Sequence, residues 1–376
     1  MPLSRSQVCQ SAGAKLSAAL PTIQTARALV GLDGFIDEII AVVDKRRDAD
    51  HFDPVSTIQA MGEKVLRAAG QSSNYELLVK QIKLGGNGPI MANALATAGI
   101  DVTYIGNLGF PEPHPVFADF AAKAKVITVA EPGHTDALEF QDGKLMLGKY
   151  QCLSEITWDR LIQCMGMEQM KKTVAAARLI AMTNWTMIPH MAEIWEELGA
   201  LIAQSPLPGR KFFVDLADPE KRTQQDILHA MAALSKLQQR VDVILGLNLK
   251  ESTQIAQAIG AGTFAVDDSE MEKIAIAIRA KMKLSCVVVH PRRGAAAATE
   301  GESARFAGPF VLEPKISTGA GDHFNAGFCL GRTLGLSLEE CLCTGVATSG
   351  YYVRTAQSPT GKQLADFAAA LPPPQQ

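Results

Sequence analysis

Short apolar segments alternate with amphipathic segments over most of the chain. Continuous apolar runs predict buried strands at 27–32, 102–105, 179–182, 211–215, 241–245 and 285–289. Apolar residues at three- and four-residue spacing predict helices at 90–98, 190–204, 223–238, 250–260, 269–282 and 324–334. Strands that are apolar throughout and alternate with helices are typical of a parallel sheet covered on both faces. We therefore predict an α/β fold built on a doubly wound, mostly parallel sheet.

Two segments depart from this alternation and predict a small lid on a domain that spans 27–371. Residues 135–150 alternate in polarity around Asp142-Gly143, which predicts a β-hairpin. The segment from about 38 to 82 is polar and mostly helical in pattern, as in 61–69 and 75–82. We assign 38–82 and 134–152 to the lid. Residues 1–26 predict a helical extension that packs on the domain surface, and 372–376 predict a frayed tail.

Composition narrows the class of protein. The 376 residues are 47% hydrophobic with a net charge of −3, which allows a large core and disfavours nucleic acid as a partner. No uncharged apolar run reaches the ~18 residues that a membrane-spanning helix needs, and the first 26 residues lack the apolar stretch of a secretory signal. The seven cysteines show no CxxC pair and fit reduced thiols. We expect a cytoplasmic protein with neither a nucleic-acid nor a membrane partner.

The most informative stretch is 317–327, which predicts a tight loop that opens a helix. The small residues Gly319, Ala320 and Gly321 let backbone N–H groups approach a ligand closely. A helix N-terminus also favours an anion, because its first N–H groups are free and its dipole is positive. Asp322 follows in the first turn. It can cap the helix, or it can take a proton from a hydroxyl that attacks a bound phosphate, and the local residues leave both interpretations open.

Two common nucleotide motifs are missing, which strengthens the case for this loop. The three Gly-Lys pairs are not followed by serine or threonine, so there is no Walker A motif. Gly86-Asn87-Gly88 lacks the third glycine of a dinucleotide fingerprint, because Met91 stands there. Polar residues also stand at the carboxyl ends of the predicted strands, where α/β sheets bind ligands. They are Asp33, Asp37, Asn107, Asn184, Asp215, Asp218 and Asn248.

Two motifs together resemble the ribokinase family of carbohydrate kinases. They are Gly85-Gly86-Asn87, which opens an alanine-rich helix, and Thr318-Gly-Ala-Gly-Asp322-x-Phe-x-Ala-Gly327. Their order and separation match the family over about residues 28–365. The resemblance implies transfer of phosphate from ATP, with Mg²⁺, to a hydroxyl of a sugar or nucleoside. It also implies that Asp322 is the general base and that the N–H groups of Gly319, Ala320 and Gly321 form an anion hole for the γ-phosphate.

The same resemblance implies which residues bind the acceptor. Asp33 and Asp37 stand where the family presents acids to substrate hydroxyls, and Gly86 and Asn87 would face the substrate. A carboxylate accepts hydroxyl hydrogen bonds well, which suits a polyol. The alternative is that the two aspartates are turn or cap residues and that Gly85-Gly86 is a plain strand-to-helix turn.

Further residues match the nucleotide side of the family. Asn248-Leu-Lys-Glu251 resembles its Asn-x-x-Glu element, in which Glu251 would hold Mg²⁺ through water. Local sequence favours a helix capping box at these positions equally well. Gly294 and Thr318 would contact the nucleotide, and the segment 348–359 would lie near the adenine.

Three departures from the family pattern affect the expectations. Ile90 replaces an asparagine that would contact the substrate, so the acceptor need not be an ordinary pentose or hexose. Ile316 replaces an acid that helps relatives to bind a monovalent cation, so we expect weak or no activation by potassium. The helical pattern of 38–82 replaces lid strands through which relatives dimerise, which puts a homodimer of that kind in question.

We therefore predict an ATP-dependent kinase for a sugar or a sugar-like molecule. A nucleoside kinase of the same fold is the alternative within the class. A non-catalytic sugar or nucleotide sensor is the alternative outside it, although the intact loop and Asp322 argue against a sensor. A nicotinamide dehydrogenase lacks its glycine fingerprint. The sequence does not identify the acceptor.

Overall fold

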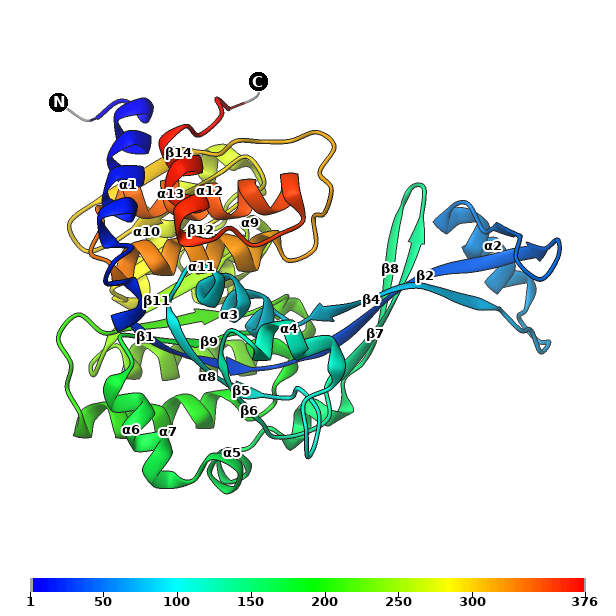
Figure 1. Ribbon diagram of the computed structural model, residues 1–376, viewed down its shortest axis with the longest axis horizontal. Coiled ribbons are helices and arrows are strands. Elements are labelled where there is room, and N and C mark those ends of the chain that lie inside the picture. Colours follow the sequence, from blue (N-terminus) through cyan, green and yellow to red (C-terminus); the bar gives the residue numbers. More distant parts are fainter. Residues whose placement is uncertain (1–2, 375–376) are drawn as a thin grey trace.

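The computed structural model describes residues 3–374, which form a body and a projecting lid (Figure 1). In this range the body holds one nine-stranded sheet in the order β14-β13-β12-β11-β10-β9-β1-β5-β6. The strands are β1 (Arg27–Leu32), β5 (Asp101–Gly106), β6 (Lys125–Thr128), β9 (Leu179–Met182), β10 (Lys211–Asp215), β11 (Asp242–Leu247), β12 (Cys286–Val289), β13 (Gly294–Ala298) and β14 (Ser303–Ala307). Pairing is parallel from β12 to β6, and β13 and β14 add antiparallel strands. The predicted doubly wound, mostly parallel sheet is confirmed.

Helices cover both faces of this sheet because its strands are apolar on both sides. In β9, Ile180 and Met182 join one core cluster, whereas Leu179 and Ala181 join the other. The first cluster lies under α5 (Trp158–Met165), α6 (Met167–Ala176), α7 (Met191–Gln204), α8 (Gln224–Leu237), α9 (Leu249–Ala258) and α10 (Met271–Met282). The second lies under α1 (Arg5–Ala19), α3 (Asn87–Thr97), α4 (Ala118–Ala121), α11 (Ala320–Thr333), α12 (Leu338–Thr355) and α13 (Gly361–Ala369). None of the helices within 3–374 is long and apolar enough to cross a membrane.

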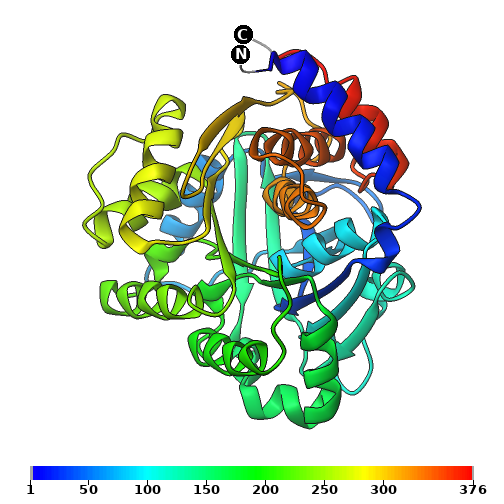
Figure 2. The same ribbon diagram turned by 90° about the vertical axis from the view of Figure 1, so that its left-hand side faces the viewer.

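The N-terminal helix α1 is part of this second core. It runs beside α13 on the outside of the body (Figure 2), and it buries Val8, Cys9, Ala12 and Leu16. The guanidinium of Arg5 donates hydrogen bonds to the carbonyls of Leu371 and Pro372, so the start of the predicted frayed tail is tethered. Residues 375–376 of that tail lie outside the described residues.

The lid is a five-stranded sheet with one helix. Its strands are β2 (Phe35–Arg46), β3 (Phe52–Pro54), β4 (Leu77–Gly85), β7 (Gly133–Phe140) and β8 (Gly143–Lys149), and its helix is α2 (Ile58–Arg67). The long strand β2 pairs antiparallel with β3 and β4 and parallel with β7. The β7–β8 hairpin turns at Asp142-Gly143, as the sequence predicts. Figure 1 shows this sheet extending sideways from the body.

The predicted helical pattern of 38–82 is wrong outside α2. Residues up to Arg46 continue β2, and the predicted helix at 75–82 is mostly β4. Leucine, lysine, glutamate and glutamine favour helices locally, but tertiary context overrides such propensities. Here Ile40, Val42 and Leu138 pack with Met61 of α2 in a small lid core. A strand is required at these positions because only the paired sheet brings those side chains to one face.

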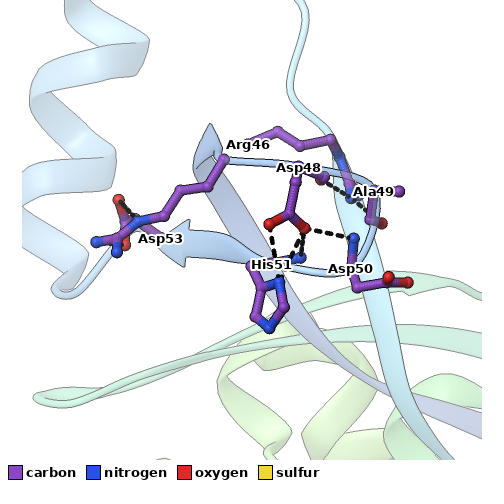
Figure 3. Close-up of polar contacts among 7 residues, drawn as sticks. Arg46, Asp48, Ala49, Asp50, His51 and Asp53 are labelled. Atoms are coloured by element: carbon purple, nitrogen blue, oxygen red, sulfur yellow. Dashed lines mark hydrogen bonds and ion pairs between the residues drawn. The ribbon is translucent and has the colours of Figure 1, made fainter.

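The turn between β2 and β3 at the lid tip is held by local polar contacts (Figure 3). The Asp48 carboxylate accepts hydrogen bonds from the backbone N–H groups of Asp50 and His51, each at 2.8 Å. It also contacts the His51 ring, and Arg46 donates to the Ala49 carbonyl at 2.8 Å. All of these groups are exposed, so we infer that they shape the turn without forming a buried site.

The lid surface exposes large apolar side chains. They are Val65, Leu66, Leu77, Val79, Ile82, Met146 and Leu147. Because the lid is a sheet, the helical pattern no longer argues against a dimer formed through lid strands. A homodimer stays a prediction.

The sequence analysis did not predict three strands of the body sheet, β6, β13 and β14. The strand β13 is rich in alanine, which has a weak preference for strands, and β6 and β14 are short. Burial of the alanines from Ala295 to Ala298 between the two helical layers stabilises β13 in place of intrinsic propensity.

Candidate active site

The carboxyl ends of the body strands border a cleft of about 630 Å³. Most of the predicted site residues line it, from elements far apart in the chain. They are Asn87, Asn248, Glu251, Gly294, Thr318, Ala320, Gly321 and Asp322. These residues therefore converge on the cleft, as the strand ends predict. Asp33, Asp37, Gly86 and Gly319 lie outside its lining.

Asp322 lies in the first turn of α11, directly after the glycine loop. Gly319 is the N-cap residue and has φ 85°, a left-handed conformation that glycine adopts without strain. The aspartate is thus not the N-cap. Its Oδ1 instead accepts a hydrogen bond from Asn87 Nδ2 at 2.9 Å. The two motifs that carry the family resemblance meet in this contact.

The surroundings of Asp322 favour its protonated form. Burial raises the pKa of Asp322 to about 7, the Asn87 hydrogen bond opposes the rise, and the negative charges of Asp33 and Glu251 add to it. A carboxyl group with a pKa near neutral pH is well matched to proton transfer, because a useful fraction is ionised and still basic. The electrostatics therefore support the general-base interpretation over simple capping.

The glycine loop presents free backbone donors. The Ala320 N–H donates to the Ser317 carbonyl at 3.2 Å, so one of the three predicted donors closes the turn. Between residues 3 and 374, the N–H groups of Gly319 and Gly321 have no hydrogen-bond acceptor. Two N–H groups at a helix N-terminus can bind a phosphate oxygen.

Asp33 follows β1 and is fully buried. Its Oδ1 accepts from the Gly88 N–H at 2.8 Å, and its Oδ2 accepts from the Asn87 N–H at 3.0 Å and from Asn184 Nδ2 at 2.7 Å. Burial raises the pKa of Asp33 to about 6 against these three hydrogen bonds. The geometry is that of an acid that holds the start of α3, so it corresponds to the capping alternative for Asp33.

Asp37 and Gly86 lie where the lid joins the body. Asp37 stands on β2 opposite Lys83 of β4, beside Thr135 of β7. Burial raises the pKa of Asp37, and a hydrogen bond with Thr135 opposes the rise. A Cβ at Gly85 would overlap the Asp37 carboxylate, which would have to shift to admit it. Gly86 is the N-cap of α3 and has φ 97°.

Asn248 and Glu251 open α9 as a capping box. Asn248 Oδ1 accepts from the Glu251 N–H at 2.9 Å, and Glu251 Oε2 accepts from the Asn248 N–H at 2.9 Å. Glu251 Oε1 accepts from the Asp218 N–H at 2.9 Å. The capping box that the sequence offers as the alternative to a metal role is therefore present. It does not exclude a metal role, because a carboxylate has about four acceptor positions and Glu251 borders the cleft.

Asp215 is a site residue to which the sequence assigned no role. It ends β10 at the cleft, and its Oδ2 accepts from Asn325 Nδ2 at 2.9 Å. Burial raises the pKa of Asp215 well above its usual value, and repulsion from Glu251 and Asp322 adds to the rise. Buried carboxylates that repel one another and border one cleft are a fitting oxygen donor set for Mg²⁺. The sequence signal was its strand-end position, but only the fold brings Asp215 near Glu251.

Several apolar side chains also line the cleft. Phe310, Val346 and Val353 line it together with Ser349 and Gly350, which belong to the segment 348–359 that the sequence assigned to the adenine side. An apolar wall with few polar groups suits a flat heterocycle.

Comparison with known proteins identifies the family and the fold of the chain. The prokaryotic ketohexokinase family matches residues 7–370. A ketohexokinase from Haloferax volcanii is 29% identical over 349 residues, which cover 91% of each protein. A carbohydrate kinase from Agrobacterium tumefaciens superposes with a TM-score of 0.64 at 18% identity, covering 93% of this chain and 98% of that one. Arabidopsis thaliana ribokinase, solved with ribose and ATP, gives a TM-score of 0.62 at 17% identity, covering 91% and 98%.

The structural likenesses show the ribokinase fold, as the two sequence motifs imply. The family match extends over nearly the whole chain, including α1 and the lid. The chain therefore belongs to the prokaryotic ketohexokinase family and is a carbohydrate kinase, which phosphorylates a sugar hydroxyl.

Proposed function

We propose that this protein transfers the γ-phosphoryl group of ATP to a hydroxyl of a ketohexose. The contact between Asn87 and Asp322 beside the two free N–H groups of the glycine loop carries the proposal. The pKa of Asp322, which burial raises to about 7, suits a general base, and the two nearby N–H groups suit an anion. The family match supports a ketohexose over a nucleoside as the acceptor.

In the proposed reaction, the acceptor hydroxyl donates a hydrogen bond to Asp322. Its oxygen bonds to the γ-phosphorus while its proton passes to the Asp322 carboxylate, and the bond from the γ-phosphorus to the bridging oxygen breaks to release ADP. The N–H groups of Gly319 and Gly321 stabilise charge on the transferred group. Asn87 holds the carboxylate in place through its 2.9 Å hydrogen bond.

Glu251 and Asp215 would hold Mg²⁺, in part through water, and the bound ion would neutralise phosphate charge. Asn248, Gly294 and Thr318 also line the cleft and would contact the nucleotide. The carboxylates of Glu251 and Asp215 suit a metal ion, and the nearby backbone and hydroxyl groups suit the triphosphate that the metal would accompany.

On the acceptor side, Asp37, Gly86 and Asn87 would contact the sugar. Hydrogen bonds from Gly88, Asn87 and Asn184 already occupy most acceptor positions of Asp33, so we propose that it acts mainly by positioning Asn87 and Asn184. The lid strand β2 would then carry Asp37 onto the bound sugar.

The test is turnover of purified protein with Mg-ATP against a matched panel: two ketohexoses, an aldohexose, ribose and adenosine. Product phosphorylation is read by mass spectrometry, and Asp322→Asn serves as the inactive control. We expect the highest kcat/KM with a ketohexose. A preference for adenosine would favour the nucleoside kinase alternative. Ligand binding without transfer to any acceptor would favour the sensor alternative.

A further inference from the structure

Two stacked rings lie behind the glycine loop. The rings of His323 and Tyr352 have centroids 3.6 Å apart and an interplanar angle of 12°. The Tyr352 hydroxyl donates a hydrogen bond to the Thr318 carbonyl at 3.0 Å. His323 Nδ1 lies 2.8 Å from the Gly319 carbonyl oxygen. Two consecutive carbonyls of the loop are thus each held by one ring of the pair.

The hydrogen-bond partners determine the tautomer of His323. A carbonyl oxygen only accepts, so Nδ1 carries the hydrogen and donates it to Gly319. Nε2 is then the acceptor, and the Ser358 hydroxyl donates to it at 2.9 Å. Ser358 in turn accepts from Asn93 Nδ2 of α3 at 3.3 Å. Burial lowers the pKa of His323 to about 4, which keeps the ring in this neutral form near pH 7.

The planar peptide bond links the direction of each carbonyl to the direction of the next N–H group. In a trans peptide the C=O and the following N–H point in opposite directions. Tyr352 holds the Thr318 carbonyl and therefore directs the Gly319 N–H away from the rings. Within residues 3–374, neither ring lines the cleft, whereas Thr318, Ala320 and Gly321 do. The two rings therefore hold the loop without bordering the cleft themselves.

We propose that Tyr352, with His323 stacked on its ring and bound to the next carbonyl of the loop, is a positioning residue that sets the direction of the Gly319 N–H for phosphoryl transfer. This inference rests on the proposed function, in which the loop binds the transferred phosphoryl group. Donors that are already oriented need no reorganisation during the reaction, which is how such groups lower a barrier. If the rings only pack, loss of one hydroxyl leaves kcat unchanged.

The sharpest variant is Tyr352→Phe, which keeps the ring stack and removes one hydrogen bond. Its control is Tyr351→Phe, because Tyr351 neighbours it on α12 but packs edge-on against Phe367, with ring centroids 5.7 Å apart. We expect Tyr352→Phe to lower kcat about 10-fold, with both KM values within about twofold. His323→Leu should also lower kcat, and His323→Asn, whose amide can replace Nδ1–H, should recover part of it.

Amide hydrogen exchange of the free protein supplies a readout that does not depend on turnover. Exchange across residues 316–322 should be faster in Tyr352→Phe than in wild type and in Tyr351→Phe. A wild type without kinase activity would refute the proposed function, while exchange would still test the rings. Wild-type kcat in Tyr352→Phe, or exchange equal in all three proteins, would overturn the positioning role.

Discussion

Asn87 Nδ2 lies 2.9 Å from Asp322 Oδ1, although 235 positions separate the two residues in the chain. The contact joins the start of α3 to the first turn of α11. A neutral donor beside a buried carboxylate stabilises the ionised form without adding a charge. Asn87 therefore lowers the pKa of Asp322 against the larger, opposite effect of burial.

The pH dependence of kcat/KM should rise through the pKa of Asp322, about 7 in the free protein, because the base must be ionised to accept a proton. Asn87→Ala removes a hydrogen bond that lowers this pKa, so its rising limb should move to higher pH. Initial rates from pH 5 to 9 measure the shift. If the rising limb of the pH profile stays at the wild-type pH in Asn87→Ala, Asn87 does not lower the pKa of Asp322 and the prediction is wrong.

Asp322→Asn should lower kcat by about 10³-fold or more, since it removes the proton acceptor and keeps the shape of the side chain. The KM for ATP should stay within about threefold, because the substituted amide carries no charge that would repel phosphate. Steady-state rates with Mg-ATP and a ketohexose test this. Activity within tenfold of wild type would exclude Asp322 as the base.

The same variant should be more stable than wild type above neutral pH. Folding raises the pKa of Asp322 from 3.8 to about 7, so the folded state binds the proton more tightly than the unfolded state. Stability from this group is full below pH 3.8 and is lost as pH rises to about 7. At about 1.36 kcal/mol per pKa unit, the loss at pH 8 is at most about 4 kcal/mol. The amide of the variant cannot ionise and avoids this loss. Urea unfolding at pH 5 and pH 8 should show a gain that grows with pH, and a gain that shrinks would contradict the assignment.

Glu251→Gln separates the capping role of Glu251 from its proposed metal role. Glutamine can complete a capping box, so the thermal midpoint should fall by no more than a few °C. Loss of the carboxylate charge should raise the Mg²⁺ concentration for half-maximal activity about 10-fold. Glu220→Gln is the matched control, because Glu220 is an exposed partner of Lys250 near the same helix. An unchanged Mg²⁺ dependence in Glu251→Gln would contradict the metal role and leave helix capping as the role of Glu251.

Replacing sodium by potassium at constant ionic strength should change kcat by less than about twofold. Ile316 offers no carboxylate for a monovalent cation at the position where relatives carry an acid, and cation sites in proteins are built from oxygen ligands. Initial rates in the two salts measure the effect. Strong activation by potassium would show that other oxygens replace the missing acid.

The carbohydrate-kinase identity could be inferred from two short motifs and their order in the chain, and most strands of the body could be inferred from local apolar runs. The parallel strands are short apolar runs, and the small residues of the loop Gly319-Ala320-Gly321 indicate a helix start by themselves. Such signals are local. A strand buried on both faces needs an apolar residue at each position, and a left-handed φ favours glycine at its own position. The β7–β8 hairpin was predictable for the same reason.

The lid strands β2 and β4 and the role of Asp33 were not predictable in this way. Leu77–Gly85 has residues that suit a helix, and only pairing with β2 makes it a strand. The sequence leaves Asp33 open between an acid that contacts substrate and a cap residue, whereas in the fold three N–H donors, two from α3 and one from Asn184, surround it. These outcomes depend on partners distant in the chain, and local propensity carries no information about them.

The sequence by itself determined that a glycine loop and an aspartate open a helix within a doubly wound domain. Only the tertiary structure decided that Asn87 contacts this aspartate, that Asp215 lies near Glu251, and that Tyr352 holds the loop from behind. The physical reason is that charge, burial and hydrogen bonding act through space. A pKa near 7 arises for Asp322 from burial and from neighbours at positions 33, 87 and 251, which folding alone brings together.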